Sequence, residues 1–346
     1  MSSPIKFAAV NQRTFDPRSG LLTSLIDDGT PLLALMAICL ILCGGFALFL
    51  SAMGHFLPQD VQFLGMDKAE LCGINQCRIV HFMFHDRVSF GGALVTIGSL
   101  YLWLACFPLR AGEPWAWWVF VVSGITGFGS FLAYLGYGYL DSWHGVATLF
   151  LLPIYIFGMA VTWRSLPQKA GPFSLLKPAA NPRLKSRFGI GRALLLVTGI
   201  GMMIGGATIL IVGMTHVFVP QDLVYIGLSA HELNAINPRL IPLIAHDRAG
   251  FGGAITTCGL ILFLCVWRGQ PSRSLWEVLA LGGGVGFATA IGIHPVIGYM
   301  SFSHLAPAYL GAAIFIVGMW LCYKPMHTEM AVPINRDKRD IQSVTV

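Results

Sequence analysis

Long apolar runs, separated by short polar segments, dominate the hydropathy pattern of the chain. A stretch of roughly 20 apolar residues is long enough to cross a bilayer as a helix. Inside hydrocarbon, a helix also satisfies its own backbone hydrogen bonds. The pattern therefore predicts an all-α membrane protein with eight transmembrane helices. They are expected at about residues 32–53, 79–106, 115–137, 144–163, 193–214, 242–267, 275–297 and 304–323.

Polar residues interrupt two of these runs in the same way. The sequence HDRVSFGG at His85–Gly92 returns as HDRAGFGG at His246–Gly253, 161 positions later. Other pairs follow at nearly the same offset: His55 and His216, Pro58-Gln59-Asp60 and Pro220-Gln221-Asp222, Glu70 and Glu232, Tyr139 and Tyr299, and His144 and His304. An internal repeat of this kind indicates that one structural unit occurs twice.

Each copy contains four predicted helices, an even number, so both copies enter the membrane in the same orientation. This predicts two tandem, parallel-oriented four-helix bundles related by an axis along the membrane normal. The predicted parts are a cytoplasmic N-terminal arm (1–30), a first bundle (31–163), a basic cytoplasmic linker (164–192), a second bundle (193–323) and a cytoplasmic tail (324–346).

Composition supports the membrane assignment. Of 346 residues, 55% are hydrophobic and 11% are charged, whereas about 25% are charged in ordinary soluble domains. The mean hydropathy is +0.69. The net charge of +6 does not indicate nucleic acid, because its excess falls on alternate loops. The linker alone contains Arg164, Lys169, Lys177, Arg183, Lys185, Arg187 and Arg192, with no acidic residue.

Cytoplasmic loops of membrane proteins are enriched in Lys and Arg. We therefore expect a multi-pass protein of the inner (plasma) membrane with both termini in the cytoplasm. Cys72 and Cys77 fall in the first outer loop, where an oxidising compartment would permit a disulfide. The alternative is two free thiols. The other six cysteines lie in or beside the apolar runs, where a thiol behaves as a small hydrophobic group.

This topology places six repeated histidines near the outer surface. His85 and His246 lie in the second helix of each copy, and His144 and His304 open the fourth. Ionisable residues at membrane depth are costly and usually face the interior of the bundle. Small residues such as Gly92 and Gly253 follow on the same helix face and leave volume for a flat macrocycle, or they allow close helix packing. Weaker candidate ligands are His55 and His216.

The acidic and basic members of the repeated motif are candidate cofactor-binding residues. Arg87 and Arg248 suit carboxylates such as heme propionates, and neighbouring residues on a helix do not face each other. Asp86 and Asp247 are expected to orient a metal-binding imidazole on a neighbouring helix. The alternative is that all four are interfacial charges that reach toward water. His294, in the seventh run, is interpreted as a core histidine with its hydrogen bonds satisfied. The alternative is that it is a polar partner to a bound group.

These residues resemble the heme A synthase family, which also has eight helices in two four-helix bundles. That family places a histidine in an H-R context on the second and sixth helices, and another on the fourth and eighth. Its members commonly carry a cysteine pair in the first outer loop. The corresponding residues here are His85, His144, His246, His304 and the pair Cys72 and Cys77.

The resemblance implies heme b, one or two groups, between His85 and His144 and between His246 and His304. It also implies an oxidoreductase that modifies heme. A membrane heme protein with these sites would otherwise transfer electrons at the outer face, with quinol or an electron-transfer protein as partner. The chain departs from the family in having HDR, and it lacks an acidic residue one turn before His85. Glu70 and Glu232 are then the nearest outer-loop acids and the candidate catalytic groups.

Two other classes of function compete with heme binding. A proton-coupled transporter or channel would use the His-Asp-Arg groups as a relay, but its site is expected near the bilayer midplane rather than at one rim. A copper or zinc site at the outer face would use His55, His85 and His144, or their counterparts, because imidazole suits both metals. Lipid is the expected environment in every case, and an oligomer is compatible with all of them.

Overall fold

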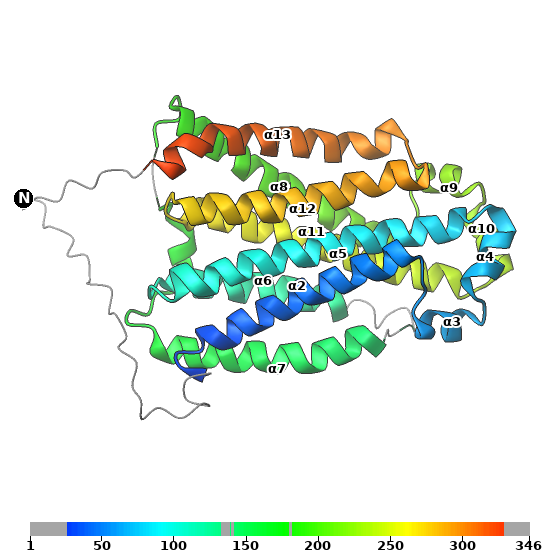
Figure 1. Cartoon of the computed structure of the whole chain (residues 1–346), viewed down its shortest axis with the longest axis horizontal. Coiled ribbons are helices and arrows are strands. Elements are labelled where there is room, and N and C mark those ends of the chain that lie inside the picture. The colour runs from blue at the N-terminus through cyan, green and yellow to red at the C-terminus, as the bar shows by residue number, and fades with distance from the viewer. Residues whose placement is uncertain (1–25, 133–138, 140–141, 180–181, 329–346) are drawn as a thin grey trace, which may run out of the picture.

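The computed structural model describes residues 26–132, 139, 142–179 and 182–328, and every regular element over these residues is helical (Figure 1). The first copy contains α2 (Thr30–Met53), α3 (Pro58–Leu64), α4 (Lys68–Asn75), α5 (Arg78–Leu104), a short π-helix η1 (Ala105–Leu109), α6 (Pro114–Leu132) and α7 (Ser142–Ser165). The linker holds a 3-10 turn, η3 (Pro172–Leu176). The second copy contains α8 (Arg187–Met214), α9 (Pro220–Ile226), α10 (Ala230–Ile236), α11 (Leu240–Arg268), α12 (Arg273–Ile297) and α13 (Phe302–His327).

Seven helices are long and apolar enough to cross a membrane: α2, α5 continued by η1, α7, α8, α11, α12 and α13. Large apolar side chains such as Leu42, Phe49 and Leu149 are exposed on the outer helices, as expected for contact with lipid. The prediction of an all-helical architecture is confirmed over the described residues, and seven of its helices are long and apolar enough to span a membrane. The eighth predicted span, 115–137, coincides with α6 but extends into residues that the structure does not describe.

Helices α5 and α11 form the centre of the molecule. Within the spanning window of each, 78% of residues are buried, against 17–28% in the other five spans. Both helices carry the HDR motif near their first turns. The sequence therefore places its repeated polar groups on the two helices that are most shielded from lipid.

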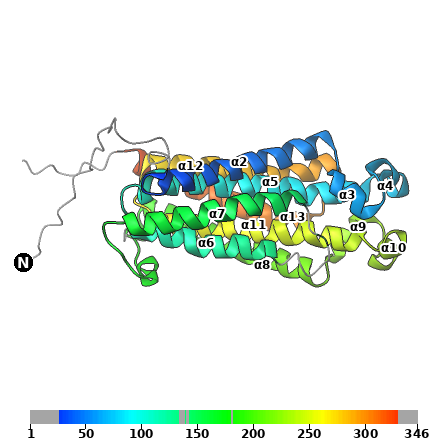
Figure 2. The same ribbon diagram turned by 90° about the horizontal axis from the view of Figure 1, so that it is seen from below.

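The two copies interlock around this centre. Helix α5 packs against α2 of its own copy and against α11 and α12 of the other copy, while α11 packs against α8, α5 and α6 (Figures 1 and 2). The third long helix of each copy therefore lies on the second long helix of the other copy. The predicted bundles are not two separate bodies, because the central helices are shared between them.

Glycines allow the helices to approach closely at equivalent places in both copies. A Cβ added to Gly44 would lie 2.5 Å from the carbonyl oxygen of Gly91. In the second copy, a Cβ on Gly252 would lie 2.8 Å from the carbonyl oxygen of Gly206. Small residues of this kind permit backbone contact between membrane helices. The α2–α5 and α8–α11 contacts therefore repeat in space as the residues repeat in sequence.

Short helices close one end of the bundle and join the copies reciprocally. The Asn75 side chain donates to the carbonyl of Ile226 (3.0 Å), and Asn237 donates to the carbonyl of Leu64 (2.8 Å). The repeat relates Asn75 to Asn237 and Leu64 to Ile226, so each contact is the counterpart of the other. Two contacts related by a pseudo-two-fold axis have this reciprocal form. The axis passes between α5 and α11, in agreement with parallel copies.

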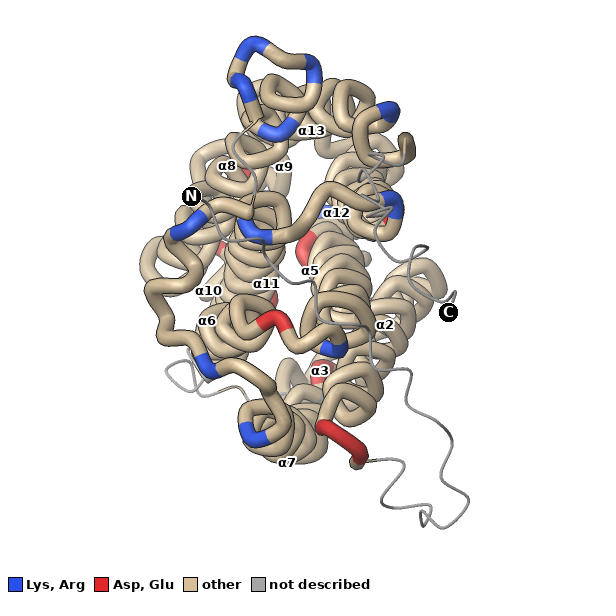
Figure 3. The backbone as a smooth tube through the Cα atoms, turned by 90° about the vertical axis from the view of Figure 1, so that its left-hand side faces the viewer, with Lys and Arg blue, Asp and Glu red and all other residues tan. Residues whose placement is uncertain are grey.

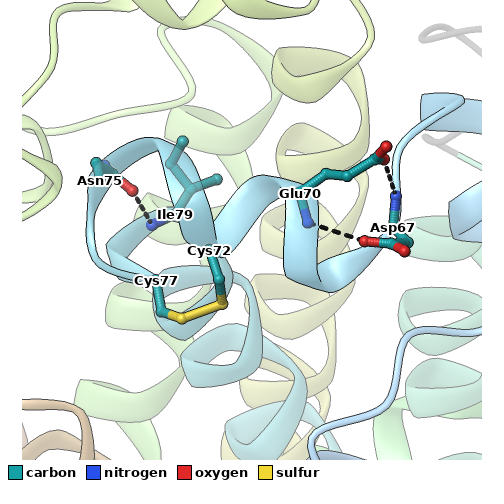
Figure 4. The surroundings of a disulfide bond; sticks show 6 residues. All are labelled: Asp67, Glu70, Cys72, Asn75, Cys77 and Ile79. Carbon is teal, nitrogen blue, oxygen red and sulfur yellow. Dashed lines mark hydrogen bonds between the residues drawn. A yellow bond between two sulfur atoms is a disulfide. The ribbon is translucent and has the colours of Figure 1, made fainter.

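The α4–α5 turn belongs to the same end. Gln76 and Cys77 both have left-handed backbone conformations, with φ of 56° and 63°, and a disulfide joins Cys72 to Cys77 across the turn (Figure 4). The structure therefore forms the cysteine pair that the first outer loop suggested.

Basic residues gather at the opposite end of the molecule. Figure 3 shows Lys and Arg concentrated in the loops and helix ends that face the viewer, which include the 164–192 linker. The N-terminal parts of α5, α7, α11 and α13, which carry the histidines, lie at the other end of the molecule (Figure 1). The charge asymmetry expected from the loops is thus present in three dimensions.

Candidate functional site

The histidines of the two copies combine across the repeat. His144 on α7 contacts His246 on α11, with Nδ1 and Nε2 3.3 Å apart. His85 on α5 contacts His304 on α13, with ring centroids 5.7 Å apart. The expected pairs, His85 with His144 and His246 with His304, are therefore wrong. The reason is the interlocked packing, which places each central helix beside helices of the other copy.

His85, His294 and His304 form a triad. One ring nitrogen from each lies within 4.8 Å of the others, which is close enough for a shared metal ion after a small side-chain adjustment. The rings of His85 and His294 are 4.5 Å apart, and those of His294 and His304 are 5.4 Å apart. His85 and His294 are only 3% exposed. The triad is thus a compact, water-poor cluster of imidazoles contributed by α5, α12 and α13.

The surroundings of His294 indicate a missing ligand more clearly than those of the other histidines in the triad. Neither of its ring nitrogens has a hydrogen-bond partner, although both are buried. The carbonyls of Ala290 and Ile291, one turn earlier in α12, interact with the ring but do not reach it with hydrogen-bond geometry. Buried polar groups are nearly always paired in folded proteins. The expectation of a satisfied core histidine is therefore wrong.

The His144–His246 pair belongs to a longer relay. Nδ1 of His246 lies 3.1 Å from Oδ1 of Asp247, the next residue in the chain. A carboxylate in this position favours the tautomer with a proton on Nδ1, which leaves Nε2 of His246 to accept from Nδ1–H of His144. The result is an Asp–His–His chain that includes Asp247, His246 and His144.

The aspartates of the motif thus act on the preceding histidine of their own helix, and not on a neighbouring helix as expected. In the first copy, Oδ1 of Asp86 lies 3.0 Å from Nδ1 of His85, but the two atoms do not have hydrogen-bond geometry. A carboxylate beside a metal-binding imidazole fixes its orientation and raises its basicity.

The arginines of the motif bind aspartates from both copies. Arg87 donates from Nε to Asp247 (2.7 Å) and from Nη1 to Asp60 (2.6 Å). In the equivalent site, Arg248 lies 3.5 Å from Asp86 and donates from Nη1 to Asp222. The sequence-based expectation that these arginines do not pair with the adjacent aspartate is confirmed. Their carboxylate partners are protein side chains, so heme propionates are not needed to explain them.

A tyrosine completes each network. The hydroxyl of Tyr139 donates to Asp60 (2.6 Å), and that of Tyr299 donates to Asp222 (2.8 Å). Burial and the nearby Asp222 carboxylate raise the pKa of Tyr299 well above its ordinary value, so this phenol stays protonated. Tyr299 also stacks on His304, with ring centroids 4.5 Å apart.

The candidate cofactor-binding glycines serve packing instead. A Cβ on Gly92 would lie 1.8 Å from the Thr289 hydroxyl of α12, and one on Gly253 would lie 2.2 Å from the Ser130 hydroxyl of α6. The volume beneath His85 and His246 at these positions is therefore occupied by a helix of the other copy, so the alternative of close packing is correct.

The remaining candidates lie outside both histidine clusters. His55 and His216 are exposed, and they belong neither to the pair nor to the triad. The Glu70 and Glu232 carboxylates accept hydrogen bonds from the backbone N–H groups of Asp67 (2.8 Å) and Ser229 (2.7 Å) (Figure 4 shows the former). Both glutamates are exposed residues of capping boxes, which explains their repetition without a catalytic role.

The sequence patterns did not predict several residues of the candidate site. His294 has no histidine counterpart in the repeat, so the repeat gave no reason to single it out. Asp60, Asp222, Tyr139 and Tyr299 are repeated residues, and that repetition was the available signal. Comparison with protein-family models, curated proteins and solved structures finds no match to this chain.

Proposed function

We propose that this chain is an integral membrane copper protein of the electron-transferring oxidoreductase class. The observation that carries the proposal is the triad of His85, His294 and His304, in which His85 and His294 are buried and the ring nitrogens of His294 have no hydrogen-bond partner. In this proposal the chain crosses the inner membrane eight times, with α6 as the eighth span. Its basic end and both termini are cytoplasmic, and the triad lies near the outer face.

The ligand chemistry supports copper or zinc. The triad offers three imidazoles and no thiolate, a set that suits both metals. Metal–nitrogen distances to histidine are about 2.0–2.1 Å, so nitrogens that share an ion are separated by about 4 Å or less. The observed limit of 4.8 Å requires the rings to close by less than an ångström.

The local charge favours a monovalent ion. Asp86 and Asp222 carry two negative charges, and Arg248 supplies one positive charge, all within the buried network beside the triad. The sum is one uncompensated negative charge in a region of low dielectric constant, where unpaired charge is costly. Cuprous ion would neutralise the site, whereas a divalent ion would leave an excess positive charge. Copper also provides the two oxidation states that electron transfer requires.

The other histidine cluster fits heme b poorly. Two imidazoles on opposite sides of one iron must have their nitrogens about 4 Å apart, twice the usual metal–nitrogen distance. His144 and His246 are 3.3 Å apart. The cavity beside them has a volume of about 220 Å³, below the roughly 300–1,000 Å³ of typical sites for drug-sized ligands. Heme b is therefore retained only as an outcome of the test below.

The test is metal analysis of the protein purified in detergent without chelators. We expect one copper per chain, and a loss of at least about tenfold in copper content in His294→Gln, because removing an imidazole leaves only two ligands. His55→Gln, at an exposed position outside the triad, is the matched control and should retain copper. Size-exclusion profiles and melting curves establish that each variant is folded.

Three results would overturn the copper proposal. The first is stoichiometric zinc in place of copper, and the second is copper that persists in His294→Gln. The third is a metal-free protein that does not take up cuprous ion on reconstitution. A pyridine hemochrome spectrum of the same sample addresses heme directly, and one heme b per chain would replace copper as the proposed redox group.

A further inference from the structure

Basic side chains surround Trp320 where α8 begins and α13 ends. Arg187, in the first turn of α8, lies over the Trp320 ring, with its guanidinium carbon 4.7 Å from the ring centroid. It also donates from Nη2 to the Trp320 carbonyl (3.3 Å). Lys324 follows Trp320 by four residues, so it lies on the same face of α13, one turn closer to the basic end. Both cations are exposed, and the Trp320 side chain is 63% exposed.

The turn before α8 brings two more cations to this place. The backbone N–H and the hydroxyl of Ser186 both donate to the carbonyl of Arg183 (2.8 and 2.7 Å). This turn keeps the exposed Arg183 and Lys185 beside Arg187. Figure 3 shows Lys and Arg gathered around the ends of α8 and α13 that face the viewer. We call Arg183, Lys185, Arg187 and Lys324 the basic cluster.

The charge of the basic cluster is not balanced by protein carboxylates. Over the residues that the structure describes, none of its four members forms an ion pair. Arg273, at the same end of the molecule, differs because it pairs with Glu277 (2.7 Å). The sequence after α13, 329–346, contains three acidic and three basic residues, so it supplies no net negative charge. A cluster of like charges attracts an anionic partner.

Exposed apolar side chains continue from the basic cluster along both helices. Ile190 lies one turn after Arg187 on α8, and Ile316 lies one turn before Trp320 on α13. Both isoleucines are exposed, and both helices are long and apolar enough to cross a membrane. Tryptophan is enriched where the hydrocarbon of a bilayer meets its headgroups. This surface therefore combines cations at headgroup level with an apolar strip at acyl-chain level.

We propose that the basic cluster and Trp320 bind the headgroup of an anionic phospholipid, whose acyl chains lie along Ile190 and Ile316. The planar guanidinium of Arg187 suits a phosphate group, and basic sites between membrane helices favour anionic headgroups. A zwitterionic lipid brings its own cation and would leave the charge of the cluster unbalanced. A soluble anion would not use the apolar strip. The site lies at the opposite end from the His85–His294–His304 triad, so it does not depend on the copper proposal.

Binding is tested by titrating delipidated protein in dodecyl maltoside with dioleoyl phosphatidylglycerol or with dioleoyl phosphatidylcholine, and by measuring the melting temperature. A lipid that binds the folded protein raises this temperature, and we expect the increase only with phosphatidylglycerol. The concentration that gives half of the increase should rise about tenfold or more in Lys185→Gln/Arg187→Gln. The reason is that each basic side chain near an anionic headgroup contributes about a fivefold factor in affinity.

The matched control is Lys169→Gln/Arg273→Gln, which removes the same charge from the same end but outside the basic cluster. Its response to phosphatidylglycerol should change less than about threefold, and the melting temperatures without lipid show that each variant is folded. Equal losses in the two double variants would indicate diffuse attraction and would overturn the site. Equal stabilisation by phosphatidylcholine or by inorganic phosphate would overturn the choice of ligand, as would stabilisation by polyglutamate without a response to lipid.

A second measurement locates the lipid without altering the basic cluster. Phosphatidylglycerol with brominated acyl chains should quench the fluorescence of Trp320, measured as the difference between wild type and Trp320→Phe in mixed bilayers. The same mole fraction of brominated phosphatidylcholine should quench Trp320 less, because it does not accumulate at the site. Equal quenching of Trp320 by the two brominated lipids would contradict the proposal.

Discussion

Arg87 and Asp247 lie 2.7 Å apart, Nε to Oδ2, although they come from different copies of the repeat. The equivalent pair, Arg248 and Asp86, is 3.5 Å apart. Each central helix therefore places its arginine on the aspartate of the other. The same aspartates lie beside His246 and His85, so the contact that joins the copies also places a carboxylate next to each histidine.

Removing Arg87 is expected to destabilise the protein strongly. Arg87→Gln leaves Asp60 and Asp247 facing each other without compensation, and loss of one partner from a buried ion pair costs about 3–5 kcal/mol. The double variant Arg87→Gln/Asp247→Asn should lose less than the sum of its single variants, because the two residues interact directly. Chemical unfolding in detergent measures these differences.

The control for this prediction is Arg273→Gln. Arg273 pairs with Glu277 at 2.7 Å, but its side chain is 73% exposed, and exposed pairs of this kind contribute only about 0.3–0.5 kcal/mol. A loss in Arg87→Gln no larger than in Arg273→Gln would show that the inter-copy pair is not a main source of stability.

Side chains added at Gly92 should separate the copies. Gly92→Val places methyl groups where the Thr289 hydroxyl lies, and overpacking costs about 1–3 kcal/mol or more. Gly45→Val on α2 is the matched control, because nothing lies within 4 Å of a Cβ added at Gly45. The melting temperature should fall clearly for Gly92→Val and little for Gly45→Val. Equal melting temperatures would contradict the close α5–α12 contact.

The Cys72–Cys77 disulfide should stabilise the α4–α5 turn modestly. It closes a short loop, for which the loss of chain entropy in the unfolded state predicts about 2 kcal/mol. Cys72→Ser/Cys77→Ser should therefore lower stability by that order without changing metal content, since neither cysteine touches the triad. A membrane-impermeant maleimide applied to spheroplasts should label these cysteines only after reduction. Labelling without a reductant would contradict the disulfide.

The α10 cap gives the structure a defined acid sensitivity. Hydrogen bonds from the Ser229 backbone and hydroxyl lower the pKa of Glu232 below its ordinary value of 4.5. A carboxyl whose pKa is lowered by folding contributes stability that is complete above pH 4.5 and is lost as the pH falls through the folded-state pKa. The melting-temperature difference between wild type and Glu232→Gln should therefore be largest above pH 5 and shrink below pH 4. A difference that grew on acidification would have the wrong sign.

Periodicity and repetition identified most of the polar residues that matter. The HDR motif, the repeated histidines of α5, α7, α11 and α13, and the cysteine pair all make specific contacts in the structure, and the apolar runs correspond to long helices. These features can be deduced from the sequence alone. A segment that crosses a bilayer must be long and apolar, and the repeat shows which residue of one copy corresponds to which residue of the other. The functions proposed for Gly92, Gly253, Glu70 and Glu232 followed from the same repetition, but their repetition reflects packing and helix capping.

Only the tertiary structure decided which histidines meet. Sequence placed His85 and His144 in one copy, whereas packing brings His85 to His294 and His304, and His144 to His246. Hydropathy does not specify helix neighbours in a membrane, because lipid-facing and buried positions are both apolar. Neighbours are chosen instead by steric fit, such as that of Gly92 against Thr289, and by ion pairs such as Arg87 with Asp247. Such contacts join residues far apart in the sequence, so they exist only once the helices have packed.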